Sequence, residues 1–150
     1  MSFLTGRNYN KVMNETIATF GYPSTLIKEY KHWVVLLRPE QITLGTLVLA
    51  AKSEARHLGE LDSAEWEEFA RVSTFAENLL IDRFGAEKFN YLALMMKDPN
   101  VHFHFIPRYS KPVDLVGTQY VDPDWPLKTE FKPMDISPEN LEHIKAALTE

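Results

Sequence analysis

The chain has 150 residues, of which 45% are hydrophobic and 25% charged, with no cysteine and a formal net charge of -5. This composition is typical of one globular domain, and it excludes disulfides, thiolate zinc sites and a cysteine nucleophile. The negative charge argues against a nucleic-acid-binding domain, which usually carries a basic patch, but it permits a small phosphate ligand held by a local cluster of donors.

The first ten residues, MSFLTGRNYN, lack the charged-then-apolar layout of a signal peptide. The longest apolar runs are too short to span a bilayer. We therefore expect a cytoplasmic protein without membrane or nucleic-acid partners.

The N-terminal part of the chain predicts one helix and three strands. The helix is expected from about Tyr9 to Phe20, where a Gly-Tyr-Pro turn ends it. Runs rich in β-branched and aromatic residues indicate strands at residues 25–30, 32–38 and 46–51. Pro39 stops the second of these strands, and Gly45 precedes the third.

The middle of the chain predicts the longest helix, Leu61–Phe84. Asp62 and Glu65 have the spacing of a capping box, apolar residues recur at helical spacing, and Gly85 suits the C-terminal cap. Two strands are expected next, at residues 89–96 and 101–106, joined by the turn-forming residues 97–100. Within that turn, Asp98 has the ordinary role of a turn residue or, alternatively, orients a neighbouring side chain.

The C-terminal part predicts an irregular segment, residues 109–135, and a final helix that begins at Ser137 and Pro138. Tyr120 and Trp125 in the irregular segment either cover a pocket or a subunit partner, or form a small satellite core. Antiparallel hairpins with one long helix between them and a helix at the end indicate an α+β fold in a single domain, residues 1–150.

The strongest candidate site is the strand within Asn100–Tyr109, NVHFHFIPRY. Side chains alternate between the two faces of a strand, so Asn100, His102 and His104 share one face while the intervening apolar residues face the core. The two imidazoles are then about 7 Å apart along the strand. A neutral histidine nitrogen can attack phosphorus, and a second histidine can donate a hydrogen bond to the phosphate oxygens.

The pattern by itself leaves other interpretations open. Two histidines at this spacing also occur on plain polar strand faces beside solvent, and they could bind one metal ion. A metal site needs further ligands, for which the chain offers few candidates, so we expect neither a metal nor another cofactor. Arg108, at the end of the same strand, is a candidate phosphate contact.

The segment Asn100–Arg108 resembles the histidine-triad signature, His-φ-His-φ-His-φ-φ with φ hydrophobic, followed by Pro-Arg, at every position except the first. Upstream, WVVLLRP at 33–39 and LGTLVL at 44–49 look like the paired strands of that superfamily around a Pro-Gly-His turn. Arg56-His57-Leu58 followed by Leu61-Asp62 looks like its lead-in to the central helix. The match covers about residues 30–109.

The resemblance implies a histidine-triad-like fold: a five-stranded antiparallel sheet with a long central helix and a C-terminal helix, with its core at 25–109 and an extension at 110–150. It implies a homodimer and a hydrolase or nucleotidyl transferase acting on nucleoside phosphoramidates or dinucleoside polyphosphates through a nucleotidyl-histidine. His102 would be the nucleophile and His104 a phosphate contact, with Asn100 the third member of the catalytic set. The substrate-binding candidates are Leu36, Arg38, Asn90 and Arg108.

The chain departs from the superfamily's pattern at several positions. Asn100 replaces the first histidine and cannot titrate near pH 7. Thr46 stands where the turn carries another histidine, Leu44 replaces the proline of that turn, and Arg38 lies near a common ribose-contacting asparagine. These departures keep a second hypothesis open, a nucleotide-binding module of the same fold with little or no turnover.

Overall fold

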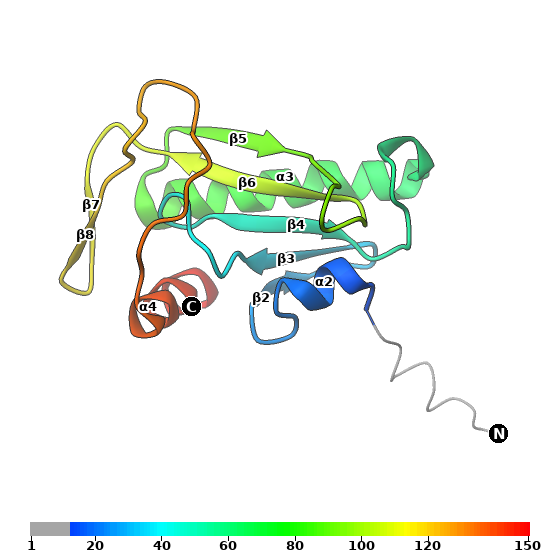
Figure 1. Ribbon diagram of the computed structural model, residues 1–150, viewed down its shortest axis with the longest axis horizontal. Helices are drawn as coiled ribbons and strands as arrows, with labels where there is room; N and C mark the ends of the chain where they lie inside the picture. The colour runs from blue at the N-terminus through cyan, green and yellow to red at the C-terminus, as the bar shows by residue number, and fades with distance from the viewer. Residues whose placement is uncertain (1–12) are drawn as a thin grey trace.

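A five-stranded antiparallel sheet is the centre of the structure, a computed structural model that describes residues 13–150 (Figure 1). The sheet has the strand order β2-β3-β4-β6-β5, with every pairing antiparallel. Its strands are β2 (Leu26–Glu29), β3 (Trp33–Leu37), β4 (Leu47–Ala51), β5 (Lys88–Leu92) and β6 (His102–Arg108). The predicted α+β fold is thereby confirmed.

Both faces of the sheet are covered, which is why every residue of β3 and β4 is buried. Helix α3 (Ser63–Phe84) covers one face and lies behind the sheet in Figure 1; its Val72, Ala76 and Leu80 share a core cluster with the odd-numbered residues of β3. The other face packs against helix α2 (Glu15–Thr19), where Ile17 and Phe20 share a second cluster with the even-numbered residues of β3. The sheet is therefore the middle layer of three.

Helix α3 has the caps that the sequence predicts. The Asp62 carboxylate accepts a hydrogen bond from the Glu65 backbone N–H at 2.9 Å, and the Glu65 carboxylate accepts one from the Asp62 N–H. Gly85 ends the helix in the left-handed conformation with φ 74°. Capping residues determine helix ends locally, so the sequence pattern locates both ends well.

The first predicted helix is shorter than expected. Residues 9–12 lie outside the described part of the chain, and α2 begins at Glu15, capped by the Asn14 side chain. The Asn14 amide also donates to the carbonyls of Ala51 and Ser53. Long-range bonds from Asn14 thus hold α2 on the sheet.

The structure differs from expectation at the end of β5. This strand stops at Leu92 instead of Met96, and three residues further on Met95 has a positive φ of 45°. Met96 is consequently 81% exposed and does not pack on the sheet. The turn before β6 is therefore part of a longer irregular connection.

The C-terminal extension is not wholly irregular. Strands β7 (Val113–Leu115) and β8 (Thr118–Tyr120) form a hairpin around Val116 and Gly117, which both have positive φ. Helix α4 (Pro138–Thr149) then begins at the Ser137 cap, as predicted. Tyr120 belongs to the same hydrophobic cluster as α3 and the sheet, so it is a core residue.

None of the helices within residues 13–150 is long and apolar enough to cross a membrane.

Candidate functional site

The two histidines of β6 lie side by side under α2. His102 is paired with Ala50 and His104 with Val48, so both side chains are on the sheet face that α2 covers. Their ring centroids are 4.9 Å apart and the rings are almost perpendicular. His102 is 1% exposed and His104 is 4% exposed, so both are isolated from bulk solvent.

The hydrogen bond of His102 determines which of its ring nitrogens is nucleophilic. Nδ1 lies 2.7 Å from the backbone carbonyl oxygen of Asn100, and because a carbonyl can only accept, Nδ1 must carry the proton. A neutral ring protonated at Nδ1 has its lone pair on Nε2. Burial lowers the pKa of His102, an effect that Arg38 reinforces and that the Asn100 carbonyl and Asp98 oppose. The ring is therefore neutral at physiological pH.

His104 is also held neutral. Burial lowers its pKa from 6.5 to about 3, with smaller contributions from the nearby His102 and Arg38. Its Nδ1 atom is buried and has no hydrogen-bond partner among residues 13–150. A buried polar atom without a partner is costly and calls for a physical explanation.

Two phenylalanines from distant segments pack on the histidines. Phe20, just after α2, lies with its ring centroid 5.5 Å from that of His102 and 5.8 Å from that of His104. Phe131, from the C-terminal extension, lies 5.0 Å from His104. The guanidinium of Arg38 lies over the Phe131 ring at 4.9 Å. The histidines are thus enclosed by aromatic rings.

Two small cavities adjoin this cluster. One, of 170 Å³, is lined by both histidines, Arg38, Phe131 and residues 94–98. The other, of 380 Å³, is lined by Thr19, Phe20, residues 38–40, Lys97 and Asp98. Arg38, Lys97 and Asp98 line both cavities, so the chain places two cations and one carboxylate beside the imidazoles. Such a cluster suits an anionic ligand with a polar, hydrogen-bonding part.

Asn100 faces helix α2. Its Oδ1 accepts hydrogen bonds from the Thr16 N–H and hydroxyl, and the Thr16 hydroxyl accepts the Asn100 N–H. Its amide nitrogen donates to the Glu54 carbonyl. The side-chain bonds of Asn100 therefore hold α2, and its backbone carbonyl is the group that reaches the histidines. Asp98 lies in the cavity lining, where its charge raises the pKa of His102.

The structure brings together only some of the expected substrate contacts. Arg38 lies in the site, with burial lowering its pKa and Glu40 and Asp98 opposing that effect. Leu36 is fully buried in the cluster beneath α2. Asn90 points instead at Arg108, accepting a hydrogen bond from its Nη1 at 2.9 Å.

Arg108 has a structural set of partners. Its Nε and Nη2 donate to the Asp122 carboxylate at 2.7 and 3.1 Å, and Nη2 also donates to the Leu127 carbonyl. Both side chains of this ion pair are almost completely buried. Arg108 thus fastens the C-terminal extension to the sheet, away from the histidine cluster.

The loop before β4 is held by hydrogen bonds from the side chains of Thr46 and Gln41. The Thr46 hydroxyl accepts from the backbone N–H groups of Ile42 and Thr43 and donates to the Thr43 carbonyl. The Gln41 amide makes four more bonds to the loop backbone. These two side chains build the loop internally, which accounts for a threonine at this position.

Sequence reasoning missed Thr16, Phe20 and Phe131 as residues of the site. They come from segments far from β6 in the chain, and their contacts with Asn100 and the histidines arise only on folding. Phe20 carried one signal, its place at the end of the predicted first helix. Phe131 lies in the segment expected to be irregular.

For the part of the chain that the structure describes, no group of three or more His, Asp or Glu side chains is arranged to hold a metal ion. A metal ion bound by His102 and His104 would find no third His, Asp or Glu ligand placed to complete its site in this part of the chain.

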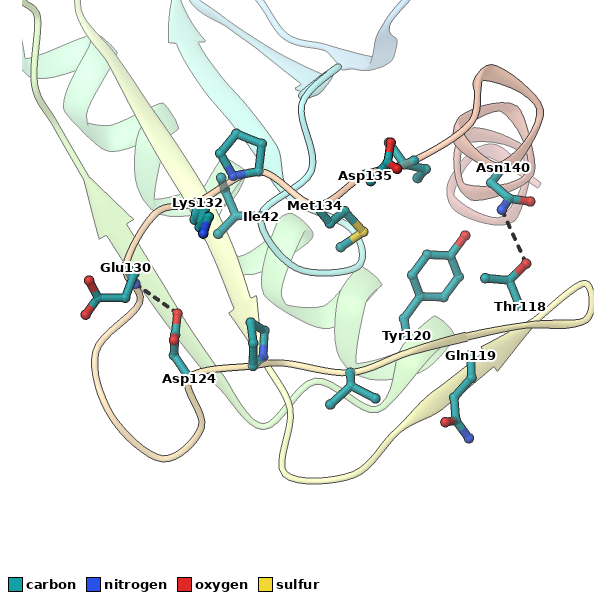
Figure 2. A pocket seen from close by; sticks show the side chains of 14 residues that line it. Ile42, Thr118, Gln119, Tyr120, Asp124, Glu130, Lys132, Met134, Asp135 and Asn140 are labelled. Atoms are coloured by element: carbon teal, nitrogen blue, oxygen red, sulfur yellow. Dashed lines mark hydrogen bonds between the residues drawn. The ribbon is translucent and has the colours of Figure 1, made fainter.

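A separate cavity of 660 Å³ lies in the C-terminal extension (Figure 2). It is lined by β8 and residues after it, by Glu130 and residues 132–136, and by Asn140 of α4, which donates to Thr118. Tyr120 projects into it from β8, and its hydroxyl has no hydrogen-bond partner within residues 13–150. Residues 130–136 separate this cavity from the histidine cluster, because Phe131 lies on the histidine side.

Comparisons with solved structures identify the fold. The sequence matches no family model, and no curated protein shows significant similarity to it. Solved structures do match. A histidine triad protein from Marinobacter aquaeolei VT8 superposes with a TM-score of 0.68 at 23% identity, covering 91% of this chain and 92% of that one. A histidine triad protein from Sinorhizobium meliloti 1021 gives a TM-score of 0.68 at 19% identity, over 91% and 93% of the two chains.

A third neighbour is described by its activity. Diadenosine triphosphate hydrolase from Plasmodium falciparum, solved in complex with cyclomarin A, has a TM-score of 0.61 at 14% identity and covers 85% of this chain and 75% of its own. Together with the sheet order and the position of the two histidines, these likenesses show that the chain has the histidine-triad fold.

Proposed function

We propose that this protein is a nucleotide phosphate hydrolase or nucleotidyl transferase that works through a covalent nucleotidyl-histidine at His102. The observation that carries the proposal is the hydrogen bond from His102 Nδ1 to the Asn100 carbonyl, which makes Nε2 the atom with the free lone pair. A nucleophile needs that lone pair at working pH, and the lowered pKa of His102 supports it.

The proposed reaction has two displacements at the α-phosphorus of a nucleoside phosphoramidate or dinucleoside polyphosphate. His102 Nε2 forms a bond to phosphorus while the bond to the amine or phosphate leaving group breaks, and that group departs with the bonding electrons. Water then attacks the same phosphorus, and the phosphorus–nitrogen bond breaks to release a nucleoside monophosphate. In a transferase another hydroxyl or phosphate replaces the water.

We assign to His104 and Arg38 the stabilisation of the negative charge that develops on the phosphate oxygens. Each is buried beside His102, and each has a nitrogen without a partner in residues 13–150, Nδ1 of His104 and Nε of Arg38. Hydrogen-bond donors that are fixed in a site with little water stabilise transition-state charge more than exposed ones. Asn100 acts as a positioning residue through its carbonyl, and Leu36, Asn90 and Arg108 support the site from outside.

Intact-protein mass spectrometry after brief incubation with adenosine phosphoramidate or diadenosine triphosphate, quenched without acid, tests the chemistry. We expect a mass increase of one adenylyl group on the wild type and none on His102→Ala. His57→Ala is the matched control, because His57 is exposed and lines neither of the two cavities beside the histidines. An adduct that persists in His102→Ala contradicts the assignment of the nucleophile.

A nucleotide-binding module without turnover is the second candidate. It is favoured by the enclosure of the histidines under Phe20 and Phe131 and by the use of Asn100 as a structural joint. It predicts that AMP binds, measured by titration calorimetry, that His102→Gln binds it equally well, and that no adduct forms with either substrate.

We also propose that the protein is a homodimer, on the strength of the fold alone. Light scattering after size-exclusion chromatography measures the mass in solution, and a monomer at micromolar concentration would contradict it. The cytoplasmic location stays a prediction.

A further inference from the structure

A strap of six residues, 128–133, crosses the histidine cluster. Just before it, the Leu127 carbonyl accepts a hydrogen bond from Arg108 Nη2 at 2.9 Å. Just after it, the Met134 N–H donates to the Gln41 carbonyl at 2.8 Å. The strap is thus tied at its ends to Arg108 and Gln41, which are both buried. Between these anchors, Phe131 reaches the histidines.

Phe131 packs against Arg38 and His104, the two groups best suited to bind a phosphate. Its ring centroid lies 5.0 Å from that of His104, and the Arg38 guanidinium lies over the same ring, 4.9 Å from its centroid. All three side chains line the 170 Å³ cavity that also contains His102. A phosphate at the His102 nucleophile would compete with this ring for Arg38 and His104.

The conformation of Phe131 is strained. Its φ is 56°, in the left-handed region that bulky side chains rarely adopt. Such outliers persist only where surrounding contacts enforce them, and they cluster at ligand clamps and switch regions. Here the Phe131 N–H donates to the Thr129 hydroxyl, so the strap holds this conformation locally.

The contacts of Phe131 leave two polar atoms unsatisfied. Arg38 Nε and His104 Nδ1 are buried and have no hydrogen-bond partner in residues 13–150. A hydrocarbon ring offers neither nitrogen an oxygen acceptor, whereas a phosphate has oxygens that accept several hydrogen bonds. The ring therefore offers no hydrogen-bond partner to two buried nitrogens, for which a phosphate ligand could supply one.

The strap has room on its other side. The side chains of Glu130 and Lys132 lie on the wall of the 660 Å³ cavity, and both are exposed (Figure 2). Within the strap, Phe131 is the residue that lines the cavity of the histidines. An outward shift of the strap consequently displaces little packed core.

We propose that Phe131 is a displaceable plug on a phosphate subsite formed by Arg38 and His104, and that binding of a nucleoside monophosphate moves the strap outward. The inference rests on the proposed function, because it concerns the same site. Phe131 would control ligand access and affinity. The phosphate would occupy the position that the Phe131 ring holds in this structure.

Calorimetric titration with AMP and with inorganic phosphate tests the plug. A protein whose binding-competent state is only partly populated binds with an affinity reduced by that fraction. Phe131→Ala removes the competitor, so we expect it to bind AMP about three- to tenfold more tightly than the wild type. Lys132→Ala, on the same strap but facing the other cavity, should bind like the wild type.

Phe131→Gly provides a second variant that tolerates the positive φ, so that folding is preserved while the ring is lost. It too should bind AMP more tightly. Hydrogen exchange gives an independent readout: AMP should speed exchange of the strap amides in the wild type. Unchanged or weaker binding by both Phe131 variants, with the folded state verified by circular dichroism, overturns the plug.

The outcomes separate the two proposals. If the wild type forms no nucleotidyl adduct but the Phe131 variants bind AMP more tightly, the covalent chemistry fails and the plug stands. If an adduct forms and the variants bind AMP no better, the plug fails and the chemistry stands. If no adduct forms and neither wild type nor variants bind AMP or phosphate, both are overturned.

Discussion

Asn100 accepts the Nδ1–H of His102 on its backbone carbonyl, while its side chain is hydrogen-bonded to Thr16 of helix α2. One residue therefore connects the helix that covers the site to the histidine proposed as the nucleophile. Asn100 thus acts through its backbone on His102 and through its side chain on α2.

The Asn100–Thr16 connection can be measured with a double-mutant cycle. Asn100→Ala and Thr16→Val each leave a buried polar group without its partner, so each should lower the free energy of unfolding by about 1–3 kcal/mol. Because the two side chains bond directly, the double variant should lose less than the two single losses together, with a coupling of about 0.5–3 kcal/mol. Urea denaturation gives these values.

Thr74→Val is the control for this cycle, since the Thr74 hydroxyl is exposed and bonds only within its own helix. It should change the free energy of unfolding by less than about 0.5 kcal/mol. Strict additivity of the Asn100 and Thr16 losses would show that the side chains do not stabilise each other.

Local patterns explain which parts of the fold were predictable. The capping box at Asp62 and Glu65 and the serine cap at Ser137 use neighbours within four residues, so both helix starts could be identified from the sequence. Alternation in β6 likewise placed His102 and His104 on one face. These features require no knowledge of the rest of the chain.

Long-range contacts explain what was missed. Arg108 was proposed as a phosphate contact because it ends the histidine strand, and nothing near it in the sequence marks Asp122, its ion-pair partner 14 positions further along the chain. The β7–β8 hairpin has strands of only three residues, too short for an alternation to stand out. Phe131 gives no periodic signal at all, and only the anchored strap brings it to His104.

The neutral state of His104 predicts a pH dependence of stability. The pKa of His104 is about 3 in the folded chain, against an ordinary value of 6.5. Above pH 6.5 its imidazole is therefore neutral in the folded and in the unfolded chain. Between pH 6.5 and about 3 the unfolded chain binds a proton that the folded chain does not, so the free energy of unfolding falls as the pH falls. The lowered pKa of His102 acts in the same direction.

Urea denaturation between about pH 7 and about pH 5 tests this sign, in a range above the usual carboxylate titrations. Replacing His104 with Gln should reduce the dependence of the free energy of unfolding on pH. The slope should fall by up to about 1.4 kcal/mol per pH unit, the value for one proton. A His104→Gln slope equal to that of the wild type would mean that His104 is not held neutral by folding.

The Arg108–Asp122 pair predicts a large loss of stability on breaking it. Its Nε–Oδ2 distance is 2.7 Å, and the side chains are 4% and 1% exposed. Asp122→Asn leaves the buried guanidinium without a compensating charge and should lower the free energy of unfolding by about 3–5 kcal/mol. Arg56→Gln breaks the exposed pair with Glu15 and should cost at most about 1 kcal/mol. Equal losses in thermal denaturation would contradict the structural role of Arg108.

The structure leaves no room for a side chain at Gly45. Gly45 lies within the Gln41–Thr46 loop with φ 85°, and an added Cβ would overlap Leu80 Cδ1 of α3. Gly45→Ala combines a left-handed backbone with overpacking, so it should lower the free energy of unfolding by at least about 2 kcal/mol. Gly59→Ala is the matched control, because nothing lies within 4 Å of its added Cβ. If chemical denaturation gives Gly45→Ala the same stability as Gly59→Ala, α3 does not pack on this loop as closely as the structure has it.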